Sequence, residues 1–161
     1  MHNFSISSDQ SSDILYGDLT AAARALTDGE PDGIANMANV SALIWQYIPD
    51  LNWAGFYRIL DGQLVLGPFQ GKSACIRIAM GKGVCGTAAA TNEVQRVADV
   101  HAFPGHIACD ADSRSELVVP VCKDGKVIAV LDLDSPLPSR FSAADEAGIT
   151  QLIAAIANNL G

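Results

Sequence analysis

Two pairs of short apolar segments, each joined by an Asp-Gly turn signal, place the strongest constraint on the fold of this 161-residue chain. The first pair is NWAGFYRIL and QLVLGPF around Asp61-Gly62, and the second is SELVVPVC and VIAVLDLD around Asp124-Gly125. Asp-Gly between two such segments is a strong signal for a β-hairpin. We expect two further strands, in VQRVADV and in SACIRIA, where Cys75 and Arg77 would share one face.

Helices are predicted on both sides of this strand-rich region. Apolar residues recur at helical spacing over 15–26, and a second helix is expected to begin after the N-cap Asp32 and to stop before Pro49. A closing helix starts near Ser142, where Ser-x-x-Asp resembles a capping box. Its apolar stripe comprises Ile149, Leu152, Ile153, Ile156 and Leu160. The prediction is an α+β domain on an antiparallel sheet over 13–161, after a polar tail over 1–12.

The charge balance restricts the partners. Ten basic against eighteen acidic residues give a net charge of −8, which disfavours nucleic acid and anionic membranes as partners. No apolar run approaches the roughly 18 residues of a spanning helix, and the first residues do not resemble a secretory signal. We therefore expect a cytoplasmic protein.

A glycine motif in the centre of the chain suggests nucleotide binding, but its context does not. Gly81, Gly83 and Gly86 in GKGVCG match G-x-G-x-x-G. A dinucleotide fold would need a crossover helix of a dozen or so residues, whereas only TAAATN precedes the next strand. We expect the glycines instead to form a tight turn that places Cys85 at the start of a short helix. The helix dipole there would favour its thiolate.

A long loop precedes the second hairpin, and loops of this length are usually functional or disordered. It carries His101, His106 and Cys109. These residues could form a metal site, although their spacing matches no standard closed zinc pattern. Alternatively, Cys109 is a nucleophile with His106 three residues away. A buried structural cysteine is the least favoured interpretation, because loops run over the surface.

The second hairpin carries acidic residues where apolar ones are usual. Asp132 and Asp134 share one face of their strand. A two-residue turn at Asp124-Gly125 would place Glu116 opposite Leu133, on the other face, whereas a three-residue loop would place it opposite Asp132. The face is then either a solvated edge or a site that binds a cation or shares a proton.

The motifs GKGVCGTAA, VADV, PGHIACD, SELVVPV, DGK and LDLDSP, in this order, resemble the free methionine-(R)-sulfoxide reductases, which are single GAF-domain enzymes. The resemblance runs from about Trp53 to Phe141. It implies a GAF domain over 13–161, with a central antiparallel sheet. The N- and C-terminal helices would pack on one side of this sheet, and loops and a short helix would form the pocket on the other.

The resemblance also implies roles for individual residues. Cys109 corresponds to the catalytic cysteine, Cys75 to the principal resolving cysteine and Cys85 to a third redox cysteine. The substrate pocket would contain three acidic residues and two aromatic residues: Glu116, Asp132, Asp134, Trp53 and Tyr57. Cys122 matches no family cysteine, and we expect it to be a small buried residue in a strand.

These residues suit the chemistry of a sulfoxide, whose oxygen is a poor leaving group. Thiolate attack needs a nucleophile, here Cys109, and an acid, here one of the three carboxyl groups. A sulfenic acid on Cys109 would then condense with Cys75 or Cys85. A thioredoxin-like reductant would reopen the disulfide. We expect a homodimer acting on free methionine-(R)-sulfoxide with neither cofactor nor metal; the alternative is a non-catalytic GAF sensor that binds a small ligand or a metal.

Overall fold

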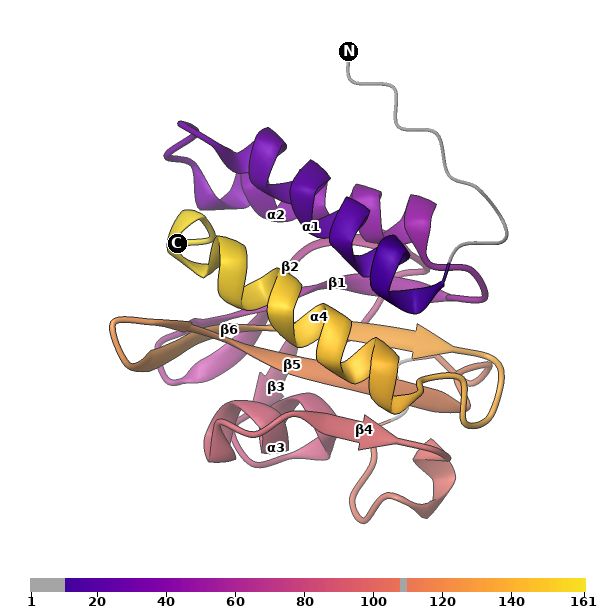
Figure 1. The fold of residues 1–161 in the computed structure, drawn as a ribbon. Coiled ribbons are helices and arrows are strands. Elements are labelled where there is room, and N and C mark those ends of the chain that lie inside the picture. Colours follow the sequence, from indigo (N-terminus) through magenta and orange to yellow (C-terminus); the bar gives the residue numbers. More distant parts are fainter. Residues whose placement is uncertain (1–10, 108–109) are drawn as a thin grey trace.

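The computed structural model describes residues 11–107 and 110–161, which form a six-stranded antiparallel sheet covered by helices on both faces (Figure 1). The strand order is β3-β2-β1-β6-β5-β4. The strands are β1 (Trp53–Leu60), β2 (Gln63–Gly71), β3 (Arg77–Ala79), β4 (Gln95–Val97), β5 (Ser115–Lys123) and β6 (Lys126–Ser135). The two predicted hairpins, β1-β2 and β5-β6, lie side by side through the pairing of β1 with β6.

The helices divide unequally between the two faces of the sheet. The helices α1 (Ser12–Thr27), α2 (Gly33–Tyr47) and α4 (Ala143–Ile156) cover one face, and α3 (Gly83–Thr91) lies on the other (Figure 1). Two short 3-10 helices, η1 (Val100–Ala102) and η2 (Ala157–Asn159), complete the set among the described residues. The predicted arrangement is confirmed.

Strand alternation separates the protein into two apolar cores. On β6, Leu131 and Leu133 join the large core beneath the three helices, whereas Val130 joins a smaller core with Val84 and Ala88 of α3. Successive side chains on a strand point to opposite faces, so residues 116, 132 and 134 lie on the side of the smaller core. Because the large core lies on the face covered by α1, α2 and α4, the polar residues of the sheet can gather on the other face.

The helix starts follow the predicted caps. The Asp32 carboxylate accepts hydrogen bonds from the backbone N–H groups of Ile34 and Ala35, at 2.8 and 3.0 Å. At the start of α4, Ser142 and Asp145 form a reciprocal capping box. Such caps satisfy N–H groups that the helix itself leaves without partners.

The second hairpin adopts neither predicted register. Its turn has two residues, Asp124 and Gly125, both with positive φ, and Lys123 pairs with Lys126. A β-bulge follows, however, in which Ile128 is an extra residue, because Cys122 pairs with Val127 and Val121 pairs with Ala129. The bulge shifts all later pairs by one residue. Glu116 therefore lies opposite Asp134 rather than Leu133 or Asp132.

The strand predicted for SACIRIA is shorter than expected. Only Arg77–Ala79 pairs with β2, so Cys75 precedes the strand and does not share a face with Arg77. The carbonyl oxygen of Cys75 instead accepts a hydrogen bond from the Tyr57 hydroxyl at 3.0 Å, which holds this segment to β1. The strand predicted for VQRVADV is likewise reduced to Gln95–Val97, because Asp99 caps η1.

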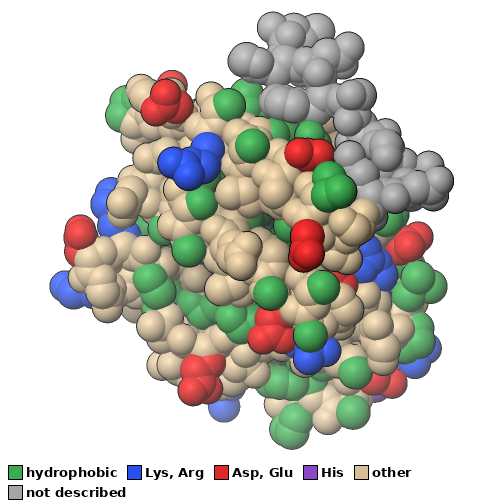
Figure 2. Space-filling model, in the orientation of Figure 1, with side chains coloured by type: hydrophobic (Ala, Val, Ile, Leu, Met, Phe, Trp, Pro, Cys, Tyr) green, Lys and Arg blue, Asp and Glu red, His purple; other side chains and the backbone are tan. Residues whose placement is uncertain are grey.

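The face seen in Figure 2 has scattered charges. Lys and Arg side chains stand singly there, separated by acidic, apolar and uncharged polar groups. Within the described ranges, no helix is long and apolar enough to span a bilayer.

Candidate active site

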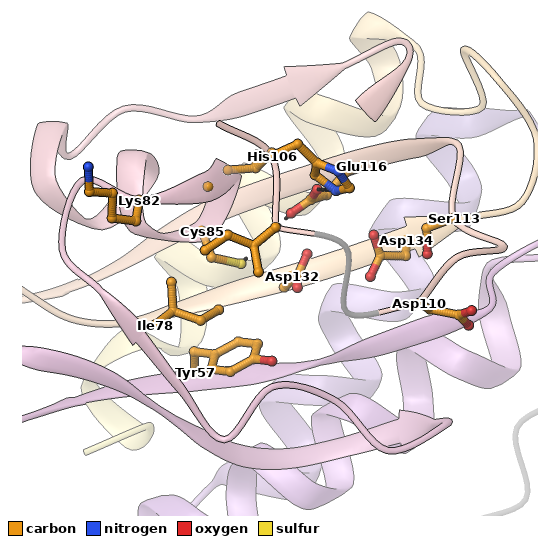
Figure 3. A pocket seen from close by; sticks show the side chains of 13 residues that line it. Tyr57, Ile78, Lys82, Cys85, His106, Asp110, Ser113, Glu116, Asp132 and Asp134 are labelled. Atoms are coloured by element: carbon orange, nitrogen blue, oxygen red, sulfur yellow. Dashed lines mark hydrogen bonds and ion pairs between the residues drawn. The ribbon is translucent and has the colours of Figure 1, made fainter. Parts of the chain in front are cut away.

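A cavity lies between the sheet and α3, on the face opposite the three large helices (Figure 3). Its walls come from elements far apart in the sequence and include Tyr57, Cys85, His106, Glu116, Asp132 and Asp134. The side chains of the three acidic residues point into this cavity (Figure 3). The structure thus brings together five of the predicted site residues.

The acidic residues are held on adjacent strands and are shielded from solvent. Glu116 and Asp132 are each 6% exposed, and Asp134 is half-buried. Burial, reinforced by the neighbouring negative charges, raises the pKa of Glu116 well above its ordinary value and does the same for the pKa of Asp134. Burial also raises the pKa of Asp132 to about 6. The cluster therefore retains protons at a pH where exposed carboxyl groups have lost theirs.

Cys85 occupies the first turn of α3 because its glycine neighbours allow a tight approach to the sheet. Gly83 has φ +62°, and a Cβ atom on Gly86 would lie 2.4 Å from the carbonyl oxygen of Ala79. The predicted tight turn and helix start are confirmed. The Cys85 thiol donates a hydrogen bond to Oε1 of Glu116, with Sγ and Oε1 3.8 Å apart.

The expected thiolate at Cys85 is wrong. Burial, followed by the charges of Asp132 and Glu116, raises the pKa of Cys85 well above its ordinary value. These effects exceed the influence of the helix N-terminus, because a thiol 4% exposed among carboxylates loses solvation and gains repulsion when it ionises. Cys85 is thus a protonated thiol and a hydrogen-bond donor.

Only one of the two loop histidines reaches the cavity. His106 Nε2 lies 4.0 Å from Oε2 of Glu116, and burial lowers the His106 pKa, so its imidazole is neutral at neutral pH. His101 is exposed and its Nδ1 lies 3.1 Å from Asp99. Cys109, the third ligand of the metal site considered from the sequence, lies outside the described residues, so that site stays a prediction.

Two predicted aromatic residues form one wall beside the cavity. The Trp53 and Tyr57 rings stack with centroids 5.8 Å apart. Phe69 of β2 stacks on Trp53 at 5.2 Å and extends the wall. Sequence reasoning missed Phe69, whose position depends on the register that pairs it with Gly55.

The cysteines are in different states. Cys75 is disulfide-bonded, whereas Cys85 and Cys122 are free. Cys109, the predicted nucleophile, lies outside the described residues. Cys122 is only partly buried, which corrects the prediction of a buried packing residue: at the β-bulge its thiol donates to Oδ1 of Asn92, the residue after α3, at 3.0 Å.

A polar network that the sequence did not reveal joins the segments that follow Cys109 and precede Cys75. Lys72 Nζ contacts Asp112 at 2.6 Å and Asp110 at 3.4 Å. Asn52 donates from Nδ2 to Asp110 at 3.3 Å and to Ser113 at 3.0 Å. The adjacency of Asp110 to Cys109 was visible in the sequence, but its distant partners Lys72 and Asn52 gave no signal.

Comparisons with known proteins agree on the fold. A family model described as "GAF domain" matches residues 35–160. The chain is 54% identical to the free methionine-R-sulfoxide reductase of Escherichia coli over 140 residues, which cover 87% of this chain and 85% of that protein.

Two solved structures are also similar. One is the free methionine-R-sulfoxide reductase of Neisseria meningitidis in complex with its substrate, which has 38% identity and a TM-score of 0.94 and covers 99% of this chain and 96% of that one. The other is the Staphylococcus aureus fRMsr in complex with substrate, which has 46% identity and a TM-score of 0.86. The match covers 91% of this chain and 95% of that one.

Proposed function

The chain belongs to the GAF domain family, within the group of free methionine-R-sulfoxide reductases, and we propose that it reduces free L-methionine-(R)-sulfoxide with Cys109 as the nucleophile. One observation carries this proposal beyond the family relationship. The acidic cluster of Glu116, Asp132 and Asp134 shares a cavity with a thiol and lies beside an aromatic wall, and two of its three side chains are only 6% exposed. This combination offers an acid, a cation-binding group and an apolar surface to a small sulfoxide.

The first step transfers oxygen from the substrate to the enzyme. The Cys109 thiolate attacks the sulfoxide sulfur while a carboxyl group of the acidic cluster protonates the sulfoxide oxygen. The hydroxyl group then moves from the substrate sulfur to the Cys109 sulfur as the bond between the two sulfurs breaks, so methionine leaves and Cys109 becomes a sulfenic acid. The raised pKa values of Glu116 and Asp134 support this role, because they keep a transferable proton in the cavity at neutral pH.

The second step regenerates the thiol. The Cys75 thiol attacks the sulfenic sulfur, water leaves, and a disulfide forms; a thioredoxin-like dithiol then reduces that disulfide by exchange. The disulfide-bonded state of Cys75 and the raised pKa of Cys85 favour Cys75 as the principal resolving residue. A thiol that stays protonated at neutral pH is a poor nucleophile.

The same cavity accounts for the choice of a free amino acid. The acidic cluster bears the negative charge that an α-ammonium group would pair with, and Trp53 and Tyr57 offer an apolar surface to the thioether methyl group. A methionine sulfoxide residue inside a peptide has no ammonium group and would leave the buried carboxylates unpaired. Selectivity then follows from the penalty on the wrong substrate.

The decisive experiment measures turnover of free methionine-R-sulfoxide with dithiothreitol. We expect activity on the free R epimer, little on the S epimer or on peptide-bound sulfoxide, and none in Cys109→Ser. Cys122→Ser is the matched control and should retain full activity, because its thiol lies outside the cavity. Activity that survives Cys109→Ser would overturn the nucleophile. Absence of turnover in the wild-type protein would favour a non-catalytic sensor.

Resolution is tested with Cys75→Ser. This variant should complete one stoichiometric turnover and then fail to cycle with thioredoxin, whereas Cys85→Ser should continue to cycle. The reverse result would transfer the resolving role to Cys85.

We further propose that the enzyme is a homodimer in the cytoplasm, where a reducing environment keeps such thiols available. Light scattering with size-exclusion chromatography measures the oligomer.

A further inference from the structure

We propose that the cavity is also an inhibitory site for one borderline-soft divalent cation such as Zn²⁺, ligated by Cys85, Glu116 and Asp132, with His106 as the fourth ligand. The ion would be an inhibitor and not a cofactor. Binding of the cation does not depend on the proposed reductase function, whereas the inhibition rests on it.

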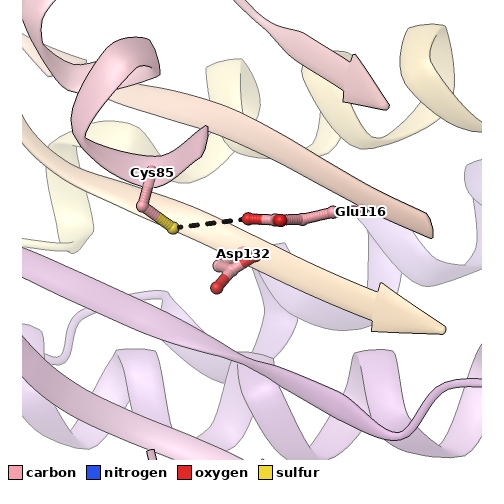
Figure 4. A group of neighbouring side chains, drawn as sticks. All are labelled: Cys85, Glu116 and Asp132. Atoms are coloured by element: carbon pink, nitrogen blue, oxygen red, sulfur yellow. Dashed lines mark hydrogen bonds between the residues drawn. The ribbon is translucent and has the colours of Figure 1, made fainter. Parts of the chain in front are cut away.

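The distances suit a single ion. One ligand atom from each of Cys85, Glu116 and Asp132 lies within 4.8 Å of the others, and Sγ of Cys85 is 3.8 Å from Oε1 of Glu116 (Figure 4). Tetrahedral zinc has bonds of about 2.3 Å to sulfur and about 2.0–2.2 Å to oxygen, which places neighbouring ligand atoms about 3.5 Å apart. Rotation of these side chains through small angles would bring all three atoms to an ion.

A second observation concerns a buried carboxylate oxygen of the same cluster. Oδ1 of Asp132 is buried and has no hydrogen-bond partner within the described part of the chain. The residue is 6% exposed and points into the cavity (Figure 3). None of the ion pairs among the described residues joins a Lys or Arg to this cluster. A buried carboxylate oxygen without a partner is costly, and a bound cation would remove that cost.

The ligand types select the class of ion. A thiolate, two carboxylates and an imidazole are typical ligands of zinc and cobalt, whereas magnesium and calcium prefer oxygen alone. His106 Nε2 is 4.0 Å from Oε2 of Glu116, which places its imidazole next to the three other ligands.

The ion and the substrate would compete for the same side chains of this cavity. The ion would use the carboxylates that we assign to the substrate. Metal and substrate therefore exclude each other, and inhibition should be competitive.

Cobalt provides a direct test, since a thiolate-to-Co²⁺ charge-transfer band reports sulfur ligation without any turnover. The background is the Cys75→Ser/Cys109→Ser protein, in which Cys85 and Cys122 are the remaining thiols. We expect the band to appear on titration with Co²⁺, to disappear on adding Zn²⁺, and to be abolished by Cys85→Ser but retained in Cys122→Ser. Absence of the band, or its survival in Cys85→Ser, would overturn the proposal.

Two further variants distinguish a loss of metal binding from a loss of folding. Asp132→Asn and His106→Gln should each weaken Co²⁺ binding by about tenfold or more while circular dichroism stays unchanged. Unaltered affinity in both variants would place the ion elsewhere. In the wild-type enzyme, Zn²⁺ should raise KM for the sulfoxide and leave kcat unchanged. An inactive enzyme that still shows the cobalt band would refute the reductase but not the metal site.

Discussion

Glu116 and Asp134 lie directly opposite each other on β5 and β6, on the face of the sheet that lines the cavity. Like charges in such a cross-strand pair destabilise a sheet. Here the raised pKa values of both groups reduce that repulsion, since a protonated carboxyl group carries no charge. The pair is therefore tolerated in the folded protein because it retains protons.

Stability should fall as the pH rises through the titration of this cluster. Unfolded Asp132 loses its proton near its ordinary value of 3.8, whereas the folded protein holds the Asp132 pKa at about 6. Between these values the folded state binds more protons, so the free energy of unfolding decreases with increasing pH. The difference in pKa corresponds to about 3 kcal/mol.

Asp132→Asn removes this contribution. Relative to the wild type, the variant should gain up to about 3 kcal/mol between pH 4 and pH 8, measured by urea unfolding in the presence of reductant. Glu93→Gln, an exposed change outside the cavity, is the control. The prediction would be contradicted if the difference in the free energy of unfolding between the wild type and the variant stayed constant over this pH range.

Glu116→Gln should impair the chemical step. The amide is similar in size but cannot supply a proton to the sulfoxide oxygen, so kcat should fall by about 10²- to 10⁴-fold. Steady-state kinetics with dithiothreitol measure the change, and Glu93→Gln, an exposed change outside the cavity, is the matched control. A kcat within twofold of the wild type would exclude Glu116 as the acid.

Gly86→Ala should disturb the site through the backbone. The added methyl group would lie 2.4 Å from the Ala79 carbonyl oxygen, so α3 must shift and carry Cys85 with it. We expect a loss of about 1–3 kcal/mol in the free energy of unfolding and reduced activity. Gly17→Ala on α1 has nothing within 4 Å and should be neutral or stabilising. Equal stability of the two variants would show that the approach of α3 is not tight.

Lys72→Met should slow disulfide formation. Lys72 connects its own segment, which leads to Cys75, with Asp110 and Asp112, which follow Cys109. Loss of this connection should lower the rate of disulfide formation by about tenfold and leave the first step little changed. Acid-quenched thiol counting in a single turnover separates the two rates. Lys126→Met in the β5-β6 turn is the control. Identical rates of disulfide formation in the two variants would show that Lys72 does not position the two segments.

The fold could be predicted where signals are local. Asp-Gly turns, the Asp32 cap and the Ser142 capping box act within a few residues, and each appears where expected. The membership of the acidic cluster was also foreseen, from strand alternation and the family resemblance. The register that assembles it was not, because the bulge at Ile128 depends on packing against the whole sheet.

The state of Cys85 shows a second limit of local reasoning. Its place at a helix start follows from the glycines, but its pKa depends on carboxylates 31 and 47 residues away in the sequence. The same applies to Lys72 and Asp110, which meet only after the chain has folded. Contacts of this kind leave no periodic pattern in a single sequence.

The extra residue in β6 makes the hairpin tolerant of one length change and intolerant of others. Deletion of Ile128 would remove the bulge and still leave Glu116 opposite Asp134, with only the packing of that side chain lost. Deletion of Val130 with the bulge retained would instead turn Glu116 and Asp132 to opposite faces. Insertions and deletions, more than substitutions, therefore limit how this hairpin can diverge while the cavity remains acidic.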